Sequence, residues 1–101
     1  MDLSQKDWKS KFEVDENAFL LDVRTLEEFK AGHITNAVLL DFRQAKEFIE
    51  GIQSFDSSKN YYVYCRSGMR SAQACKLMNQ MGIYKTYNLL GGFMEWDGES
   101  C

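Results

Sequence analysis

The sequence contains no long apolar run, and residues 1–16 are mainly polar and charged. A membrane-spanning helix needs about 20 predominantly apolar residues, and a secretory signal needs an apolar segment after its charged start. We therefore expect no membrane partner and a cytoplasmic location.

Cysteine is also scarce, with three residues at positions 65, 75 and 101. Their spacing matches neither a disulfide framework nor a zinc site, and this usage fits a reducing compartment. Basic residues are fewer than acidic ones, with 12 against 15, which gives a formal net charge of −3. Such a charge argues against general nucleic-acid binding, so any anion site must be local.

Proline, internal repeats and low-complexity segments are absent as well, and no linker divides the chain. A chain of 101 residues is long enough for one modest core and too short for two. We therefore predict a single domain over residues 1–101. The composition, 45% hydrophobic and 27% charged, is ordinary for a globular protein.

The most informative stretch begins with a run of β-favouring residues and ends in a helical pattern. It reads Tyr61-Tyr62-Val63-Tyr64-Cys65-Arg66-Ser67-Gly68-Met69-Arg70-Ser71. Residues 61–64 favour a strand, and from Ala72 to Met81 the composition becomes helical. Cys65 is therefore predicted to lie at the carboxyl end of a strand, before a tight loop.

The loop that follows this cysteine is suited to stabilising an anion. Gly68 allows a tight turn, and the hydroxyls of Ser67 and Ser71 can cap free backbone amides. Backbone N–H groups ahead of a helix form an anion cradle, to which Arg66 and Arg70 add positive charge. Such surroundings lower a thiol pKa from about 8.5 to roughly 3.5–7.5, which predicts a reactive thiolate. The alternative is a cysteine that only fills the core, for which converging donors would have no purpose.

Strand and helix patterns alternate along the whole chain. Short apolar runs predict strands at residues 19–23, 37–40, 61–64 and 86–89. Helices are predicted after a capping serine at Ser4 and at residues 26–31, 45–52, 72–81 and 93–96. This alternation favours a three-layer α/β fold with a mainly parallel sheet and helices on both faces. Ligands of such sheets bind beyond the carboxyl ends of the strands, where Cys65 is placed.

The segment from Cys65 to Ser71 resembles the active-site loop of rhodaneses, the thiosulfate:cyanide sulfurtransferases. Other family landmarks follow in order: Leu21-Asp22-Val23-Arg24, Glu27-Glu28-Phe29, Gly32-His33-Ile34, and Leu90-Gly91-Gly92-Phe93 with Trp96. The resemblance covers residues 19–96 and implies a single rhodanese-like module with a four- to five-stranded sheet. The fifth strand would lie near the N-terminus, where the sequence pattern does not show it convincingly.

The resemblance also implies an activity. Cys65 would accept a sulfane sulfur from thiosulfate or a related small anion and hold it as a persulfide. The acceptor would be cyanide in assays, or a thiol or a protein cysteine in the cell. Neither a metal nor an organic cofactor is needed. The substrate-binding residues would be Arg66, Ser67, Gly68, Met69 and Arg70.

Two other functions share these features. A cysteine phosphatase also holds a thiolate in an amide cradle, but it places five residues between the cysteine and the final arginine, whereas four separate Cys65 from Arg70. The shorter loop favours a sulfur atom over a phosphoryl group. An inactive rhodanese-like docking module usually lacks the cysteine, which is present here.

Several other polar residues have structural interpretations. Asp22, Arg24 and Glu27 or Glu28 are expected to form one ion-pair network that supports the scaffold. His33 could in principle form a nucleophile pair with Cys65, but the family uses this position structurally. Cys75 is expected to flank the core stripe of the following helix, and Cys101 to lie in a loose tail without a partner.

Overall fold

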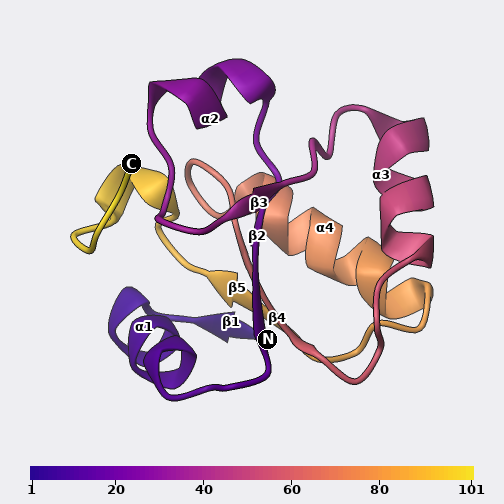
Figure 1. Cartoon of the computed structure of the whole chain (residues 1–101), viewed down its shortest axis with the longest axis horizontal. Helices are drawn as coiled ribbons and strands as arrows, with labels where there is room; N and C mark the ends of the chain where they lie inside the picture. Colours follow the sequence, from indigo (N-terminus) through magenta and orange to yellow (C-terminus); the bar gives the residue numbers. More distant parts are fainter.

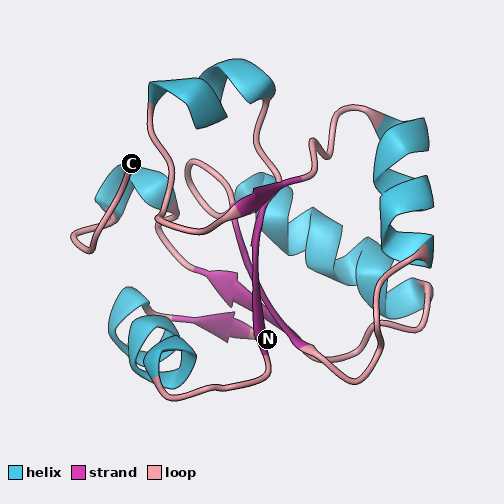
Figure 2. Ribbon diagram, viewed as in Figure 1, coloured by secondary structure: helices cyan, strands magenta, loops and turns pink.

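The computed structural model describes all residues 1–101 and contains one sheet of five parallel strands in the order β1-β5-β4-β2-β3. The elements are β1 (Asp2–Leu3), α1 (Gln5–Glu13), β2 (Ala18–Asp22), α2 (Leu26–Ala31), β3 (Val38–Leu39), α3 (Ala45–Gln53), β4 (Asn60–Tyr64), α4 (Met69–Gln80), β5 (Thr86–Leu89) and the 3₁₀ turn η1 (Phe93–Glu95). Figure 1 and Figure 2 show α1 on one side of the sheet and α3 and α4 on the other. The predicted three-layer α/β fold is confirmed.

The central strand β4 explains how two layers of helices are held. Successive side chains of a strand point to opposite faces, and a parallel sheet is covered on both. Tyr61 and Val63 belong to the core cluster that packs under α3 and α4. Tyr62 and Tyr64 belong to the second cluster, on the side of α1. The alternation continues into Cys65, which joins the first cluster.

The first helix forms as predicted. The hydroxyl of Ser4 accepts a hydrogen bond from the Asp7 amide at 3.2 Å, which caps the helix start. Trp8 and Phe12 stack with ring centroids 5.8 Å apart, and both rings meet Tyr62 edge-on. The i, i+4 aromatic pair therefore packs α1 against the sheet.

None of the helices combines the length and apolar character needed to cross a bilayer.

The edge strand β1 supplies the fifth strand that the family resemblance implied. Asp2 lies beside Asn88 and Leu3 beside Leu89 in a parallel ladder with β5. Two residues are too few to produce a periodic pattern, so only pairing with β5 defines this strand.

The C-terminal residues differ from the prediction. Ser100 forms an antiparallel bridge with Ile34, and the Cys101 amide donates to the His33 carbonyl at 2.8 Å. The His33 amide donates in return to the carbonyl of Cys101 at 3.2 Å. The tail expected to be loose is therefore docked, because these backbone groups pair with a segment far away in sequence.

Candidate active site

Cys65 immediately follows β4, and its loop leads into α4. Figure 1 shows this loop at the same end of the sheet as α2. Cys65 has no solvent-accessible surface and is a free thiol. The position at the carboxyl end of a central strand agrees with the sequence prediction.

Three hydrogen-bond donors converge on the Cys65 sulfur. The Gly68 amide donates to Sγ at 3.1 Å, and the amide and hydroxyl of Ser71 each lie 3.3 Å from it. Burial raises the pKa of the thiol, but donors from Ser71, Gly68 and Ser67 outweigh it, so the pKa of Cys65 lies below its ordinary value. The loop therefore favours a thiolate in a fully buried position.

The loop keeps this geometry because its carbonyl groups are bound elsewhere. The Phe93 amide donates to the Cys65 carbonyl at 2.8 Å, and the Met94 amide donates to the Arg66 carbonyl at 3.0 Å. Gly92 makes this approach possible with a φ of +57°, since a Cβ there would stand 2.6 Å from the Cys65 carbonyl oxygen. The turn at η1 thus removes two acceptors from the neighbourhood of the sulfur.

The start of α4 corrects two details of the prediction. The helix begins at Met69 rather than at Ala72, with Gly68 as its N-cap at a φ of +101°. No side chain caps this helix, so the expected capping by Ser67 and Ser71 is wrong. The Ser71 hydroxyl faces the sulfur instead, because the third residue of the helix points toward the loop that precedes it.

The second arginine of the loop does not stand free. Arg70 binds Glu28 of α2 through two hydrogen bonds of 2.7 and 2.9 Å. This contact lowers the pKa of Glu28 to about 2, while partial burial opposes the shift and the Thr25 amide adds to it. The expected network of Asp22, Arg24 and Glu27 or Glu28 is therefore wrong in its last member, because Glu28 pairs with Arg70 and Glu27 forms no ion pair.

Two other arginines remain available at the mouth of the loop. Arg66 and Arg43 line the same hollow as Arg70, and neither takes part in an ion pair. Arg43 follows Asp41, whose side chain accepts a hydrogen bond from the Arg43 amide at 2.8 Å. The sequence analysis missed Arg43 because it lies after β3, more than twenty residues from the loop. A small anion would meet two unpaired guanidinium groups here, and the carboxylates of Glu27, Glu28 and Asp41 line the same hollow.

Comparison with known proteins identifies the family. Residues 4–99 match the family model described as Rhodanese-like domain. The chain belongs to this family. It is 41% identical over 92 residues to "Putative sulfurtransferase YtwF" of Bacillus subtilis (strain 168), which covers 91% of this chain and 85% of that protein.

Two further comparisons agree with the family. The protein named "Sulfurtransferase" of Allochromatium vinosum is 35% identical over 81 residues, or 80% of this chain and 73% of that protein. The crystal structure of a rhodanese-like domain protein from Staphylococcus aureus superposes with a TM-score of 0.83 and 30% identity, covering 97% of this chain and 92% of that one. The resemblance found from the motifs is confirmed.

The remaining polar residues of this rhodanese-like domain serve the scaffold. Arg24 binds Asp22 at 2.7 Å in a buried ion pair, donates to the Gly32 carbonyl at 2.7 Å and lies over the ring of Phe93. The His33 ring stacks on Phe29, and its Nδ1 lies 2.9 Å from the carbonyl of that residue. Neither His33 nor Asp22 contacts the Cys65 sulfur.

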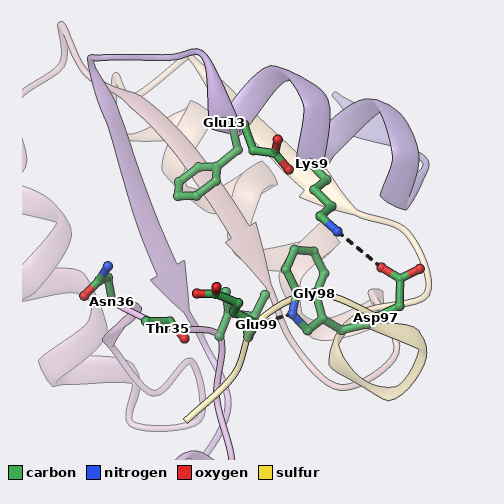
Figure 3. Close-up of a pocket in the computed structure, with 10 residues that line it drawn as sticks. Lys9, Glu13, Thr35, Asn36, Asp97, Gly98 and Glu99 are labelled. Carbon is green, nitrogen blue, oxygen red and sulfur yellow. Dashed lines mark hydrogen bonds and ion pairs between the residues drawn. The ribbon is translucent and has the colours of Figure 1, made fainter.

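A second hollow lies between α1 and the C-terminal segment (Figure 3). Lys9 and Asp97 form an ion pair of 3.5 Å across its rim, and the Trp96 indole donates to the Glu99 carbonyl at 3.1 Å. Its walls contain none of the predicted site residues. The converging donors at Cys65, rather than surface depth, therefore mark the candidate active site.

Proposed function

We propose that this rhodanese-like domain is a sulfurtransferase in which Cys65 carries the sulfur as a persulfide. The observation that carries this proposal is the set of three donors at 3.1–3.3 Å from Sγ. These donors stabilise a buried negative charge on the nucleophile without a metal or a cofactor.

The reaction has two steps in which bonds and charges balance. The Cys65 thiolate attacks the sulfane sulfur of thiosulfate and forms a new sulfur–sulfur bond to it. The sulfur–sulfur bond of thiosulfate breaks, and sulfite leaves with the bonding electrons. The outer sulfur of the persulfide now bears the negative charge. A thiophilic acceptor such as cyanide, a small thiol or a protein cysteine then removes that sulfur and regenerates the thiolate.

The charges at the loop mouth support an anionic donor. Arg66 and Arg43 are unpaired, and Arg70 is shared with Glu28. Guanidinium groups bind oxyanions through charge-assisted hydrogen bonds, so thiosulfate would find partners for its oxygens. Because Cys65 is fully buried, we expect the donor to displace side chains at the mouth as it approaches. Arg66, Ser67, Gly68, Met69 and Arg70 remain our proposed substrate-binding residues.

The names of two relatives, both sulfurtransferases, support transfer of sulfur in general and leave the donor open. Thiosulfate and the persulfide are our choice because the loop is small and cationic. A persulfide carrier needs a reduced cysteine, so we place the protein in a reducing compartment such as the cytoplasm.

Intact-mass measurement after incubation with thiosulfate tests this function. The wild type should gain one sulfur atom at Cys65 and lose it to cyanide, with release of thiocyanate. Cys65→Ser should retain the fold and form no adduct. A Cys65→Ser protein that still turns over thiosulfate would refute the assignment.

Assays with aryl phosphates test the phosphatase alternative. A phosphoryl group needs donors for three equatorial oxygens, and the loop has only four residues between Cys65 and Arg70. In addition, Glu28 holds the arginine that would bind those oxygens. We expect negligible hydrolysis; appreciable phosphatase turnover without sulfur transfer would overturn the sulfurtransferase proposal.

A further inference from the structure

The Ser71 hydroxyl lies between two acceptors but carries one hydrogen. Its oxygen is 3.3 Å from the Cys65 sulfur and also makes a very short contact with Oδ1 of Asn88. Ser71 and Asn88 are 0% and 1% exposed, so bulk water does not supply a second donor. The sulfur and the amide oxygen therefore compete for one proton.

The orientation of Asn88 is determined by its other hydrogen bonds. Its Nδ2 donates to the Asp2 carboxylate at 3.0 Å and to the Gly68 carbonyl at 3.1 Å. Both partners are acceptors, so turning the amide over would place three oxygens against one another. Oδ1 is consequently held toward Ser71. In β5, Asn88 pairs with Val63, two residues before Cys65 on the same face of the sheet.

We propose that Asn88 is a positioning residue whose Oδ1 accepts the hydrogen bond of the Ser71 hydroxyl while the sulfur of Cys65 is uncharged and gives up that hydrogen bond when the sulfur is a thiolate. This inference rests on the proposed function. In the thiolate state Ser71 donates to Sγ. Once the persulfide forms, the negative charge moves to the outer sulfur, and the Ser71 hydroxyl turns back to donate its hydrogen bond to Oδ1 of Asn88. The hydroxyl then stabilises the inner sulfur only when that sulfur is the nucleophile or the leaving group, while the amides of Gly68 and Ser71 face it throughout.

The charged and titratable groups around Cys65 form a constant background to this exchange. Arg70 and Cys75 couple electrostatically to Cys65 from α4, and Arg66 is its neighbour in the loop. Asp2 of β1 lies behind Asn88. None of these groups is changed by the variants below.

Removing the Ser71 hydroxyl and removing the Asn88 amide should shift the pKa of Cys65 in opposite directions. Ser71→Ala deletes a donor to the thiolate and should raise the pKa of Cys65 by about 1, a tenfold change in the ionisation constant. Asn88→Leu deletes the competing acceptor and should lower that pKa by about 0.5. The Gly68 carbonyl keeps its bond from the Ala72 amide, and the Asp2 carboxylate reaches solvent, so this change leaves neither group unpaired. The double variant should match Ser71→Ala closely, because Asn88 reaches the sulfur through the Ser71 hydroxyl and the Gly68 carbonyl stays fixed by the Ala72 amide.

Thiolate absorbance during pH titration measures these values in the absence of any sulfur donor. A Cys101→Ser background removes the exposed thiol, and Cys75, whose pKa burial raises to about 11, titrates separately. Thr86→Val is the matched control, since it removes a buried hydroxyl from the same strand that bonds Asn79 rather than Ser71. It should leave the pKa of Cys65 unchanged.

Asn88→Ala provides a second test if Asn88→Leu does not fold. It deletes the same acceptor with a smaller side chain and should also lower the pKa of Cys65 by about 0.5. The proposal is overturned if the folded Asn88 variant and Ser71→Ala shift the pKa in the same direction, or if their effects add in the double variant. If the titrations behave as expected but thiosulfate adds no sulfur, the proposed function fails and the role of Asn88 stands.

Discussion

Cys65 and Cys75 lie in the same core cluster and are both buried, yet their thiols are opposite in character. Burial opposes ionisation at both, but the pKa of Cys65 lies below its ordinary value, whereas burial raises the pKa of Cys75 to about 11. Three donors meet the sulfur of Cys65, while the effect of the Thr86 hydroxyl on Cys75 lowers its pKa too little to offset burial. Hydrogen bonding, rather than burial, therefore distinguishes the two sites.

The helix α4 explains this difference. The first backbone N–H groups of a helix have no partner within it, whereas interior N–H groups are already bonded. Ser71 is the third residue of α4, so its amide is free to donate to Cys65. Cys75 lies one turn further, where the amides are paired. One helix thus activates the cysteine ahead of it and leaves the cysteine within it inert.

The largest effect should come from removing each thiol in turn. Cys65→Ser should reduce sulfur uptake and turnover to background, because no other thiol lies among the loop donors. Cys75→Ala should keep full uptake and lower the free energy of unfolding by about 1 kcal/mol through lost packing. Mass spectrometry and urea unfolding measure the two outcomes. Loss of uptake in a folded Cys75→Ala protein would contradict the distinction.

The next effect is the pH dependence of alkylation at the two sites. A lowered thiol pKa against one of about 11 predicts a much higher thiolate fraction for Cys65 than for Cys75 at neutral pH. Labelling with iodoacetamide should rise as the pH passes through the lowered pKa of Cys65 and level off above it, while Cys75 stays unlabelled. Peptide mapping follows each site, and the denatured protein is the control in which both rates converge. Equal native rates would show that the loop does not activate its thiol.

A smaller effect should follow from the free charge at the loop mouth. Arg66→Ala removes a charge-assisted contact worth about 1.5–3 kcal/mol and should raise KM for thiosulfate at least about tenfold. Lys59→Ala removes a cation at the opposite end of β4 and should leave KM unchanged. Steady-state kinetics measure both. An unchanged KM in Arg66→Ala would remove Arg66 from the donor site.

The smallest effect concerns the ion pair that ties the loop to α2. The pKa of Glu28 is lowered from 4.5 to about 2 by Arg70, so this pair stabilises the fold above about pH 4.5 and its contribution is lost as the pH falls toward 2. Glu28→Gln should lower the free energy of unfolding by about 1 kcal/mol at neutral pH and by only a small part of that near pH 2. Glu27→Gln, next to it and without an ion pair, is the control. Urea unfolding at both pH values decides whether the difference shrinks in acid.

Most elements could be predicted from the sequence because their signals are local. The hydroxyl of Ser4 and the capping box of Thr25 with Glu28 mark helix starts, and the apolar run before Cys65 marks β4. The strand β1 could not be predicted from its two residues, since β5 supplies its hydrogen bonds. The docked tail was missed for the same reason, because its partner at residues 33–34 is distant in the chain.

The order of residues was sufficient to place a cysteine after a strand and a glycine-containing loop behind it, because strand and turn preferences act over a few neighbouring residues. The partners of that loop depend on the sheet order β1-β5-β4-β2-β3, which brings Asn88 of β5 beside β4 and places Glu28 of α2 against Arg70. Neither contact can be recognised in the local sequence pattern, because Ser71 and Asn88 are 17 residues apart and Glu28 and Arg70 are 42 residues apart. Tertiary packing therefore decided which donors reach the sulfur and which arginines remain free.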